Sequence, residues 1–262
     1  MTSPADARPG APTLFRSRLT SRWHEIDGSR VARPRVLMDF MEHARAQIPT
    51  HDAVHHALNH GLARAIRIEL HAPLLEPADI DVAVWLSRCG TSSYAIEHEL
   101  TRATDGALLA RAQLVFVRVG ADRRPAPVDP AVTARVHGHP QPLRLGRDLP
   151  VPAGAPRYTR AFQVLPSDEN RGRHAGHTQV VDYLDDTRRL ALLTGALPGA
   201  AGEHFQGATQ VAVDYEGELH VGDWVEARVW STSNRAPGAL VALTRRDDDS
   251  VVARGQLLWS PP

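Results

Sequence analysis

Apolar positions along the first half of the chain follow two periods in turn. Apolar and polar residues alternate loosely over residues 14–24, as they do along a half-buried strand. After Gly28 the apolar spacing becomes three and four, which predicts a buried helix that begins near Pro34. Four strand-like runs follow, bounded by Pro and Gly positions and by the Asp105-Gly106 turn; they are residues 65–70, 80–87, 93–101 and 108–119.

The second half repeats this order. Residues 158–165 are predicted as a strand, 168–176 as a polar loop and 178–193 as a helix. Four more strands are predicted at residues 209–215, 224–232, 239–245 and 251–259. The segment between the halves, 120–156, is rich in Pro, Arg and Gly, and we expect a long surface connection there.

The two halves also match residue by residue. A shift of 143 positions lays Phe15 on Tyr158, Phe40 on Tyr183 and Arg45 on Arg188. A unit of this length exceeds the roughly 20 to 50 residues of solenoid repeats, so the sequence predicts a tandem duplication of one domain. We expect a disordered tail at 1–13, one domain at 14–119, the connection at 120–156 and a second domain at 157–262.

One long helix against an antiparallel meander is an α+β arrangement. A sheet wrapped around one central helix in this order is the hotdog fold, so two copies in one chain predict a double hotdog. A single copy would leave an apolar helix face and a sheet edge uncovered, and pairing of the copies removes both problems. We therefore expect a monomer that is a pseudo-dimer, or a homodimer of such chains.

Charge and residue usage exclude several classes of function. The formal net charge is zero, which argues against a nucleic-acid partner. The chain contains no Lys, so enzymes that form a Schiff base, including those that use PLP, are excluded. We expect no cofactor. No apolar run reaches the roughly 20 residues needed to cross a membrane, so no membrane partner is expected.

Cysteine and histidine usage bear on compartment and metal binding. The single cysteine, Cys89, cannot form an intramolecular disulfide, and the N-terminus lacks the pattern of a secretory signal peptide. Two His pairs stand at i, i+4 spacing, but no carboxylate or cysteine set completes a metal site beside them; the four residues are His51, His55, His56 and His60. We expect a cytoplasmic protein without a metal.

Polar motifs recur at defined places in both halves. Arg22-Trp-His-Glu-Ile-Asp-Gly-Ser-Arg30 precedes the first helix, and the segment 105–117 is followed by an Arg-Arg-Pro sequence at 123–125. In the second half, Gly176-His177 stands six residues before Tyr183, and Tyr215-Glu-Gly-Glu218 follows a strand. In this order the motifs resemble the fatty acyl-ACP thioesterase family, which is related to the 4-hydroxybenzoyl-CoA thioesterase-like hotdog proteins.

The resemblance places one active site in the second half. It implies that the catalytic residues are Asp168, Asn170, His177 and Glu218. It also implies that the helix start at Gly176, Thr178 and Gln179 binds the thioester oxygen through backbone N–H groups. The stretch before Gly176 is longer than the family pattern, so His174 is an alternative to His177. Asp168 or Glu218 could take a proton from water, and His177 could act as general base or help to hold the thioester oxygen; the sequence leaves this open.

The first copy carries different residues at the matching positions. Glu25, Asp27 and Pro34 stand where the second copy has Asp168, Asn170 and His177. A helix that begins with Pro in place of His cannot repeat the same chemistry. We therefore expect one site per chain, with the first copy shaping the acyl tunnel. Its floor is expected to include Met38, Met41, Trp85 and Trp230.

Three functions compete on these residues. The first is a thioesterase acting on acyl-ACP or acyl-CoA in fatty-acid or polyketide biosynthesis. The second is a hotdog dehydratase, hydratase or cyclase on a carrier-bound acyl or polyketide intermediate, and the third is an acyl-binding hotdog without catalysis. In each case the expected partner is an acyl carrier protein or CoA thioester, which basic residues could attract; they are Arg157, Arg160, Arg171 and Arg173.

Overall fold

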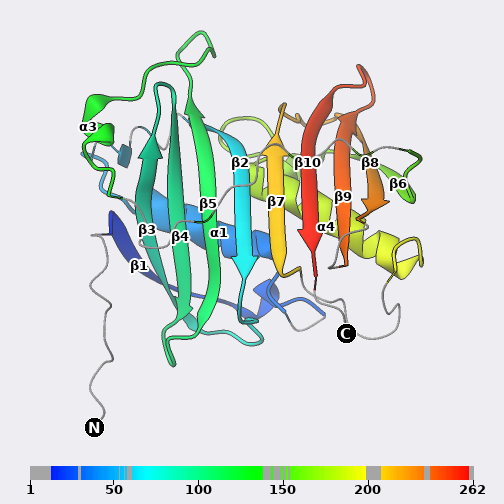
Figure 1. Cartoon of the computed structure of the whole chain (residues 1–262), viewed down its shortest axis with the longest axis horizontal. Coiled ribbons are helices and arrows are strands. Elements are labelled where there is room, and N and C mark those ends of the chain that lie inside the picture. The colour runs from blue at the N-terminus through cyan, green and yellow to red at the C-terminus, as the bar shows by residue number, and fades with distance from the viewer. Residues whose placement is uncertain are drawn as a thin grey trace.

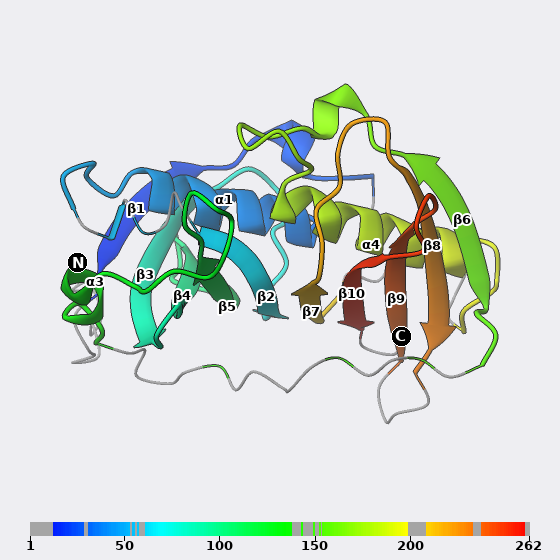
Figure 2. The same ribbon diagram turned by 90° about the horizontal axis from the view of Figure 1, so that it is seen from above.

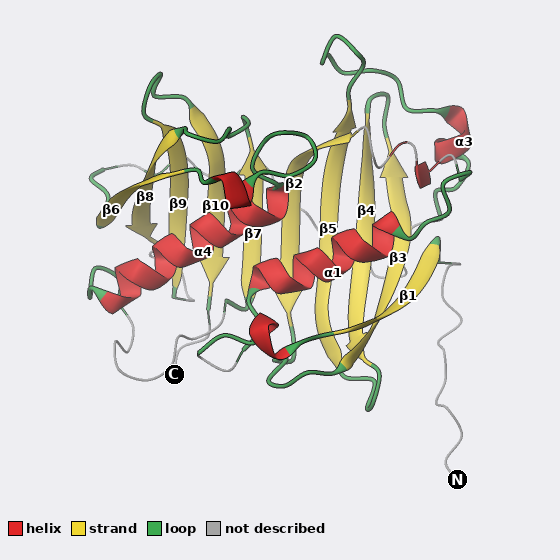
Figure 3. Ribbon diagram, turned by 180° about the vertical axis from the view of Figure 1, so that it is seen from behind, coloured by secondary structure: helices red, strands yellow, loops and turns green. Residues whose placement is uncertain are grey.

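Ten strands form one antiparallel sheet, and two helices lie against one of its faces (Figure 1). The computed structural model describes residues 13–28, 31–52, 54–55, 57, 61–137, 143, 149, 152, 154–198, 208–232 and 237–259. The strand order is β1-β3-β4-β5-β2-β7-β10-β9-β8-β6. Seen from behind, the two helices cross the same side of the sheet (Figure 3). The α+β arrangement predicted from the sequence is confirmed.

The first unit contains β1 to β5 and the helix α1. Its elements are β1 (Phe15–Thr20), the short 3-10 turn η1 (Trp23–Glu25), α1 (Pro34–Ala46), β2 (Gly61–Leu70), β3 (Asp79–Cys89), β4 (Ser93–Arg102) and β5 (Leu108–Arg118). Pro34 stands at the first helical position, where its fixed φ suits the helix and its missing N–H costs nothing. The sequence placed this helix and these strands to within a few residues.

The second unit repeats the pattern with β6 to β10 and the helix α4. Its elements are β6 (Tyr158–Gln163), η2 (Pro166–Asp168), α4 (His177–Leu193), β7 (Gln210–Tyr215), β8 (Trp224–Ser231), β9 (Gly238–Arg245) and β10 (Val251–Leu258). Each of these strands and the helix falls within a few residues of its predicted position. The order of elements in the two units is therefore the same.

The two units join through their inner strands. β2 pairs with β7 in antiparallel register, with Ile66 opposite Val213 and Ile68 opposite Val211. Arg67 on β2 also forms an ion pair with Asp214 at 3.1 Å between Nη2 and Oδ1. One continuous sheet results, curved around the helices when seen from above (Figure 2). Neither inner strand is left as an open edge.

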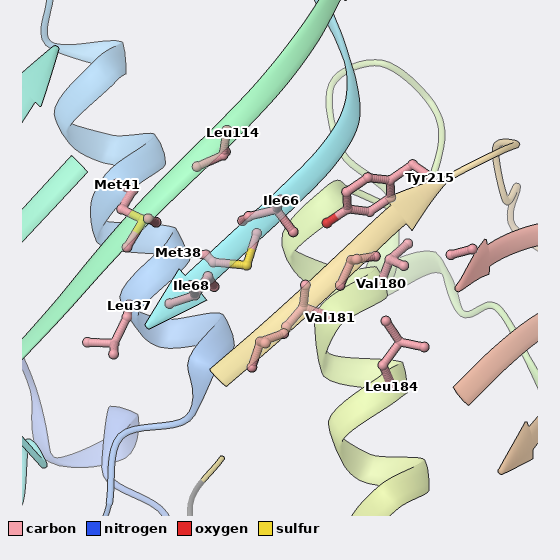
Figure 4. Packing of buried hydrophobic residues seen from close by; sticks show 14 of the residues in the cluster. Leu37, Met38, Met41, Ile66, Ile68, Leu114, Val180, Val181, Leu184 and Tyr215 are labelled. Atoms are coloured by element: carbon pink, nitrogen blue, oxygen red, sulfur yellow. The ribbon is translucent and has the colours of Figure 1, made fainter. Parts of the chain in front are cut away.

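Apolar side chains fill the space between the sheet and the helices. Figure 4 labels Leu37, Met38 and Met41 of α1, Ile66 and Ile68 of β2, Leu114 of β5, Val180, Val181 and Leu184 of α4 and Tyr215 of β7, all in the core. Strand residues alternate between this core and the opposite face of the sheet.

Strand alternation corrects the expected tunnel floor. Met38 and Met41 lie in the core under α1, as predicted. Trp85 stands between the core residues Val84 and Leu86 on β3 and therefore points to the opposite face. Trp230 is also on the outer face, where its indole N–H donates to the carbonyl oxygen of Gly154 at 3.0 Å. The prediction that these two tryptophans line the tunnel is wrong, because it did not use the two-residue period.

The connection between the units begins with a short helix, α3 (Pro130–Thr133). Farther along, the backbone N–H of Leu143 donates to Glu97 Oε2 at 3.4 Å, and that of Leu149 donates to Asp214 Oδ2 at 2.8 Å. These described residues lie on the face of the sheet opposite the helices. The expected tail lies outside the described residues apart from position 13. No described helix is both long and apolar enough to span a membrane.

Candidate active site

A cavity of about 1130 Å³ lies where the two units meet. The first unit contributes the end of α1, the start of β2, the end of β5 and the turn after it. The second unit contributes the loop before α4, the first turn of α4 and the segment 215–219 after β7. Asn170, His174, His177 and Glu218 all line this cavity. The fold therefore brings four of the predicted site residues together.

The first turn of α4 presents unpaired N–H groups. Among the described residues, none accepts a hydrogen bond from the backbone N–H of residues 177–179, and Gly176 at the N-cap supplies no side-chain cap. The helix dipole favours negative charge at this end. The hydroxyl of Tyr215 donates to the carbonyl oxygen of His177 at 3.0 Å and fixes this turn against β7. The helix start is therefore held in place and suits an oxygen that gains negative charge.

His177 is an uncharged imidazole in the cavity. Burial, reinforced by the positive charge of Arg45 and by His174, lowers the pKa of His177 to about 3. Its Nε2 is buried, has no hydrogen-bond partner in the described structure and lies 3.7 Å from Glu42 Oε2. The ring meets Phe116 edge-on, with 6.2 Å between ring centroids. A neutral imidazole of this kind can form hydrogen bonds to a substrate but is a weak base.

Glu218 is held in the cavity by a cation from the other unit. Its Oε1 accepts a hydrogen bond from Nη2 of Arg123 at 2.5 Å. Arg123 lies in the turn after β5, in a left-handed conformation with φ of 59°. The carbonyl oxygen of Glu218 accepts from the guanidinium of Arg245, which fixes the backbone as well. The Glu218 carboxylate is therefore fixed in position at the wall of the cavity.

The loop before α4 carries Asn170 and His174. Oδ1 of Asn170 accepts from the backbone N–H of Gly172 at 2.7 Å, which closes an Asx turn. The Nδ1–H of His174 donates to the carbonyl oxygen of Ala175 at 2.9 Å, so its Nε2 is the acceptor nitrogen. A Cβ at Gly172 would lie 2.8 Å from that Nε2. Glycine at this position lets the longer loop place both side chains at the cavity.

Asp168 has a different environment from the rest of the predicted set. Its Oδ2 accepts from the hydroxyl of Tyr183 at 2.7 Å and from the backbone N–H of Leu165 at 2.8 Å. Asp168 is not among the residues that line the cavity. These bonds tie the loop to α4, and burial together with the hydrogen bond that Tyr183 donates to Asp168 raises the pKa of Tyr183. The described hydrogen bonds of Asp168 hold the loop in position, and its predicted catalytic role stays a prediction.

The side chains at the helix start also face away from the cavity. Thr178 hydrogen-bonds Asp39 on α1, and Gln179 is buried. Neither of them nor Gly176 lines the cavity. Any contribution of these positions to substrate binding would come from the backbone N–H groups of the first turn.

The sequence did not mark as site residues the side chains that the first unit contributes, although Phe116 and Arg123 lie in motifs that resemble the thioesterase family. Glu42 and Arg45 reach the cavity from α1, Phe116 from β5 and Arg123 from the turn that follows. One signal was present: Arg45 matches Arg188 in the duplication, although both lie on buried helix faces. An Arg retained in both copies at a core position has a purpose other than solubility.

Within the described part of the chain, no three His, Cys, Asp or Glu side chains are grouped so as to hold a metal ion. His56 and His60 of the sequence-predicted pairs lie outside the described residues. His51 is exposed.

No protein-family model matches this chain, and no curated protein sequence matches it significantly. Several solved structures of other proteins are similar to this chain. A protein assigned as an oleoyl thioesterase from Lactobacillus plantarum is 19% identical, with 96% of this chain and 98% of that chain covered and a TM-score of 0.76. The 12:0-ACP thioesterase from Umbellularia californica is 13% identical, with 95% and 94% covered and a TM-score of 0.75.

The chain has the double hotdog fold. A MaoC-like dehydratase from Phytophthora capsici is similar to it over 96% of this chain and 97% of that chain, at 10% identity and a TM-score of 0.61. The double hotdog thus carries more than one chemistry, so the reaction has to be argued from the residues in the cavity. The residues that line the cavity of this chain come from both hotdogs.

Proposed function

We propose that this chain is a thioesterase that hydrolyses an acyl thioester of acyl carrier protein or CoA to a free acid and a thiol. One observation carries the proposal: the cavity combines the Glu218 carboxylate, the neutral His177 and the unpaired N–H groups of α4. Hydrolysis needs a base for water and donors for the carbonyl oxygen, and these groups supply both. The two thioesterases of similar structure support the same choice.

In the first step, water attacks the thioester carbon. Glu218 takes a proton from that water, and the new C–O bond forms as the carbonyl π electrons move to oxygen. The N–H groups at the start of α4 stabilise the negative oxygen, and His177 adds a hydrogen bond from a neutral ring. Asn170 orients the water or the carbonyl through its amide group, whose oxygen is already fixed by Gly172.

In the second step, the C–S bond breaks. The oxygen electrons reform the carbonyl, the thiolate leaves, and the proton held by Glu218 is returned to sulfur or to solvent. Arg123 keeps the Glu218 side chain at the cavity wall throughout, because it holds the carboxylate from the opposite hotdog. No group beyond water and the thioester is consumed.

The carrier is expected to approach over the loop before α4. Arg171 and Arg173 are exposed on this loop, next to the cavity-lining Asn170 and His174. Their charges suit the phosphates of CoA or phosphopantetheine and an acidic carrier surface. Arg160 is less suited, because its guanidinium stacks on Phe162 and hydrogen-bonds Thr187.

One observation keeps a dehydratase as the second candidate. Dehydration needs a His and a carboxylate from opposite copies, and His177 Nε2 lies 3.7 Å from Oε2 of Glu42 on α1. That distance is beyond a hydrogen bond, and the Glu42 side chain is 55% exposed. Hydrolysis is therefore the stronger proposal.

Thiol release from a panel of acyl-CoA and acyl-ACP substrates tests the proposal. We expect wild-type turnover, and we expect Glu218→Gln to lower kcat by roughly 10²–10⁴-fold as a general base is lost. His177→Ala is expected to lower kcat by roughly 10–10³-fold, as one donor to the oxyanion is lost. Asp168→Asn should lower kcat less than either of these variants, because in this proposal Asp168 acts through Tyr183 and the loop.

The control is Arg16→Gln, an exposed substitution on β1 outside the cavity. No thiol release from any substrate would overturn the proposed hydrolysis. Loss of water from a 3-hydroxyacyl substrate, abolished equally by Glu42→Gln and His177→Ala, would establish the dehydratase instead. Full hydrolytic activity in Glu218→Gln would remove Glu218 from the mechanism.

A further inference from the structure

Arg45 is a buried cation at the cavity, and no carboxylate of the described residues forms a salt bridge with it. Arg45 is 7% exposed and lines the cavity from the last turns of α1. Among the described residues it forms no ion pair. Its Nη1 lies 3.2 Å from Nε2 of His98 on β4, and its guanidinium carbon lies 5.5 Å from the ring centroid of Phe116. Only neutral groups contact the guanidinium, and the half-exposed Glu42 carboxylate attracts it from beyond salt-bridge distance.

His98 cannot balance this charge. A guanidinium has only donors, so Nε2 of His98 must accept and its proton must be on Nδ1. That Nδ1 is buried and has no hydrogen-bond partner in the described structure. Burial, together with the charge of Arg45, lowers the pKa of His98 well below its ordinary value. Burial also lowers the pKa of Arg45 to about 10, which leaves it charged at neutral pH.

In the second hotdog, the matching arginine is neutralised by a buried carboxylate. Arg188 stands at the matching position of α4 and lies 5.4 Å from the ring of Trp259, which matches Phe116. Its Nη2 and Nε donate to Oδ1 of Asp185 at 2.7 and 3.0 Å, and both side chains are almost fully buried.

Glu42 takes the place of Asp185 in the first hotdog. Its side chain is 55% exposed, and it attracts Arg45 electrostatically without a salt bridge between the two described side chains. The second hotdog therefore contains a buried ion pair at this position, whereas the first hotdog leaves the guanidinium of Arg45 facing the cavity. The difference lies at the site where substrate is expected.

A plain alkyl chain would be a poor occupant next to this group. It would bury the guanidinium against carbon, and burying a charge without a partner is costly. An oxygen on the acyl group would accept hydrogen bonds from the guanidinium N–H groups that face the cavity, and a carboxylate would also neutralise the charge. The cavity chemistry thus favours an acyl group that carries oxygen in addition to its thioester.

We propose that Arg45 is a specificity-determining residue that binds an oxygen-bearing group, a carboxylate, ketone or hydroxyl, on the acyl part of the substrate. The group lies near the thioester end of the acyl chain, because the same Phe116 ring contacts both Arg45 and His177. This inference rests on the proposed function, since it takes the thioester to bind at His177.

Binding of non-hydrolysable acyl-CoA thioethers of one chain length tests the inference. The probes are a plain acyl group, its 3-hydroxy and 3-oxo forms and a form ending in a carboxylate, measured by isothermal titration calorimetry. We expect at least one oxygen-bearing probe to bind wild type roughly 10–100-fold more tightly than the plain probe. The tightest probe identifies the group.

Three variants complete the experiment. Arg45→Met should bind all probes alike, Arg45→Lys should restore part of the difference, and Arg16→Gln should match wild type. Tightest binding of the plain probe to wild type would overturn the inference even if Arg45→Met did not fold. Discrimination that persists in folded Arg45→Met would overturn it as well.

The outcome is separable from that of the proposed hydrolysis. If no substrate releases thiol but the Arg45-dependent discrimination holds, thioesterase activity fails and the specificity assignment stands. If thiol is released and all probes bind alike, the thioesterase activity stands and the specificity assignment fails. If Arg45→Met lowers kcat equally for plain and oxygen-bearing thioesters without changing their relative binding, Arg45 stabilises the oxyanion and the inference is wrong.

Discussion

His177 is a basic residue that this fold keeps uncharged. It is surrounded by Arg45 and Glu42 from α1, by Phe116 from β5 and by His174 from its own loop. Burial is the largest cause of the lowered pKa, and the two basic neighbours add to it. In the proposed mechanism the imidazole therefore acts as a neutral hydrogen-bonding group, and Glu218 is the proposed base.

This environment makes stability depend on pH. In the unfolded chain His177 takes up a proton near the ordinary histidine pKa of 6.5, whereas in the folded protein it does so only near 3. The unfolded state thus binds more protons in this window, and stability falls as pH is lowered from 6.5. We expect His177→Gln to make the free energy of unfolding less dependent on pH between about 6.5 and 5, by up to about one linked proton.

Urea unfolding at a series of pH values measures this slope. His51→Gln removes an exposed His and serves as the control, with an unchanged slope expected. Parallel pH profiles for His177→Gln and wild type would show that the ring is accessible to protons in the folded protein.

At the scale of elements, ion pairs hold the two helices together. Arg33 at the N-cap of α1 reaches Asp182, Asp185 and Asp186 on α4, with N–O distances of 2.8, 3.6 and 2.5 Å. The side chain of Arg33 is 22% exposed and those of its partners range from 1% to 43%. Arg189 of α4 returns the contact by pairing with Asp27 of the first unit at 2.5 Å. This network fixes the middle of α4 against the first unit.

Removal of Arg33 is expected to destabilise the protein. Arg33→Met leaves Asp182 and Asp186 without their nearest cation, and the Asp182 side chain is only 14% exposed. Breaking a buried pair costs about 3–5 kcal/mol, and partial exposure reduces this to about 2 kcal/mol here. Chemical denaturation measures the change.

The matched control is Arg18→Met. Arg18 and Asp81 form a two-point ion pair at 2.7 and 2.8 Å, but their side chains are 61% and 39% exposed. Solvent screening makes such pairs weak, so a much smaller loss is expected. Equal losses for the two variants would contradict a structural role for burial at the helix contact.

At the scale of the whole molecule, each hotdog covers what the other leaves open. β2 and β7 would be open sheet edges in separate hotdogs, and α1 and α4 would lose their contact. The cavity would also disappear, because Glu218 and His177 come from one hotdog and Arg45 and Arg123 from the other. Stability and the proposed activity therefore both require the pair.

Separate expression of the halves tests this dependence. We expect residues 1–137 alone to aggregate or to form dimers through β2, because an unpaired strand edge recruits another. Co-expressed with residues 138–262, it should form a complex with the mass of the intact chain. Size-exclusion chromatography with light scattering distinguishes these states. A folded, monomeric first half would show that the interface is not needed for folding.

The order of elements was determined by the sequence, because it depends on local signals. Apolar spacing of three and four located α1 and α4, and turn residues such as Asp105-Gly106 separated the strands. Gly106 adopts φ of 70°, which glycine accommodates without strain. The duplication of 143 residues, together with this order, was sufficient to predict the double hotdog.

The surroundings of individual site residues were decided only by the tertiary structure. Asp168 looked like part of a catalytic set, but Tyr183 of the same unit binds its carboxylate. Arg45 and Arg188 were matched by the sequence, yet only the positions of Glu42 and Asp185 decide which guanidinium is open. Local sequence determines secondary structure through short-range forces, whereas the charge state and direction of a side chain depend on neighbours that only the folded chain brings into contact.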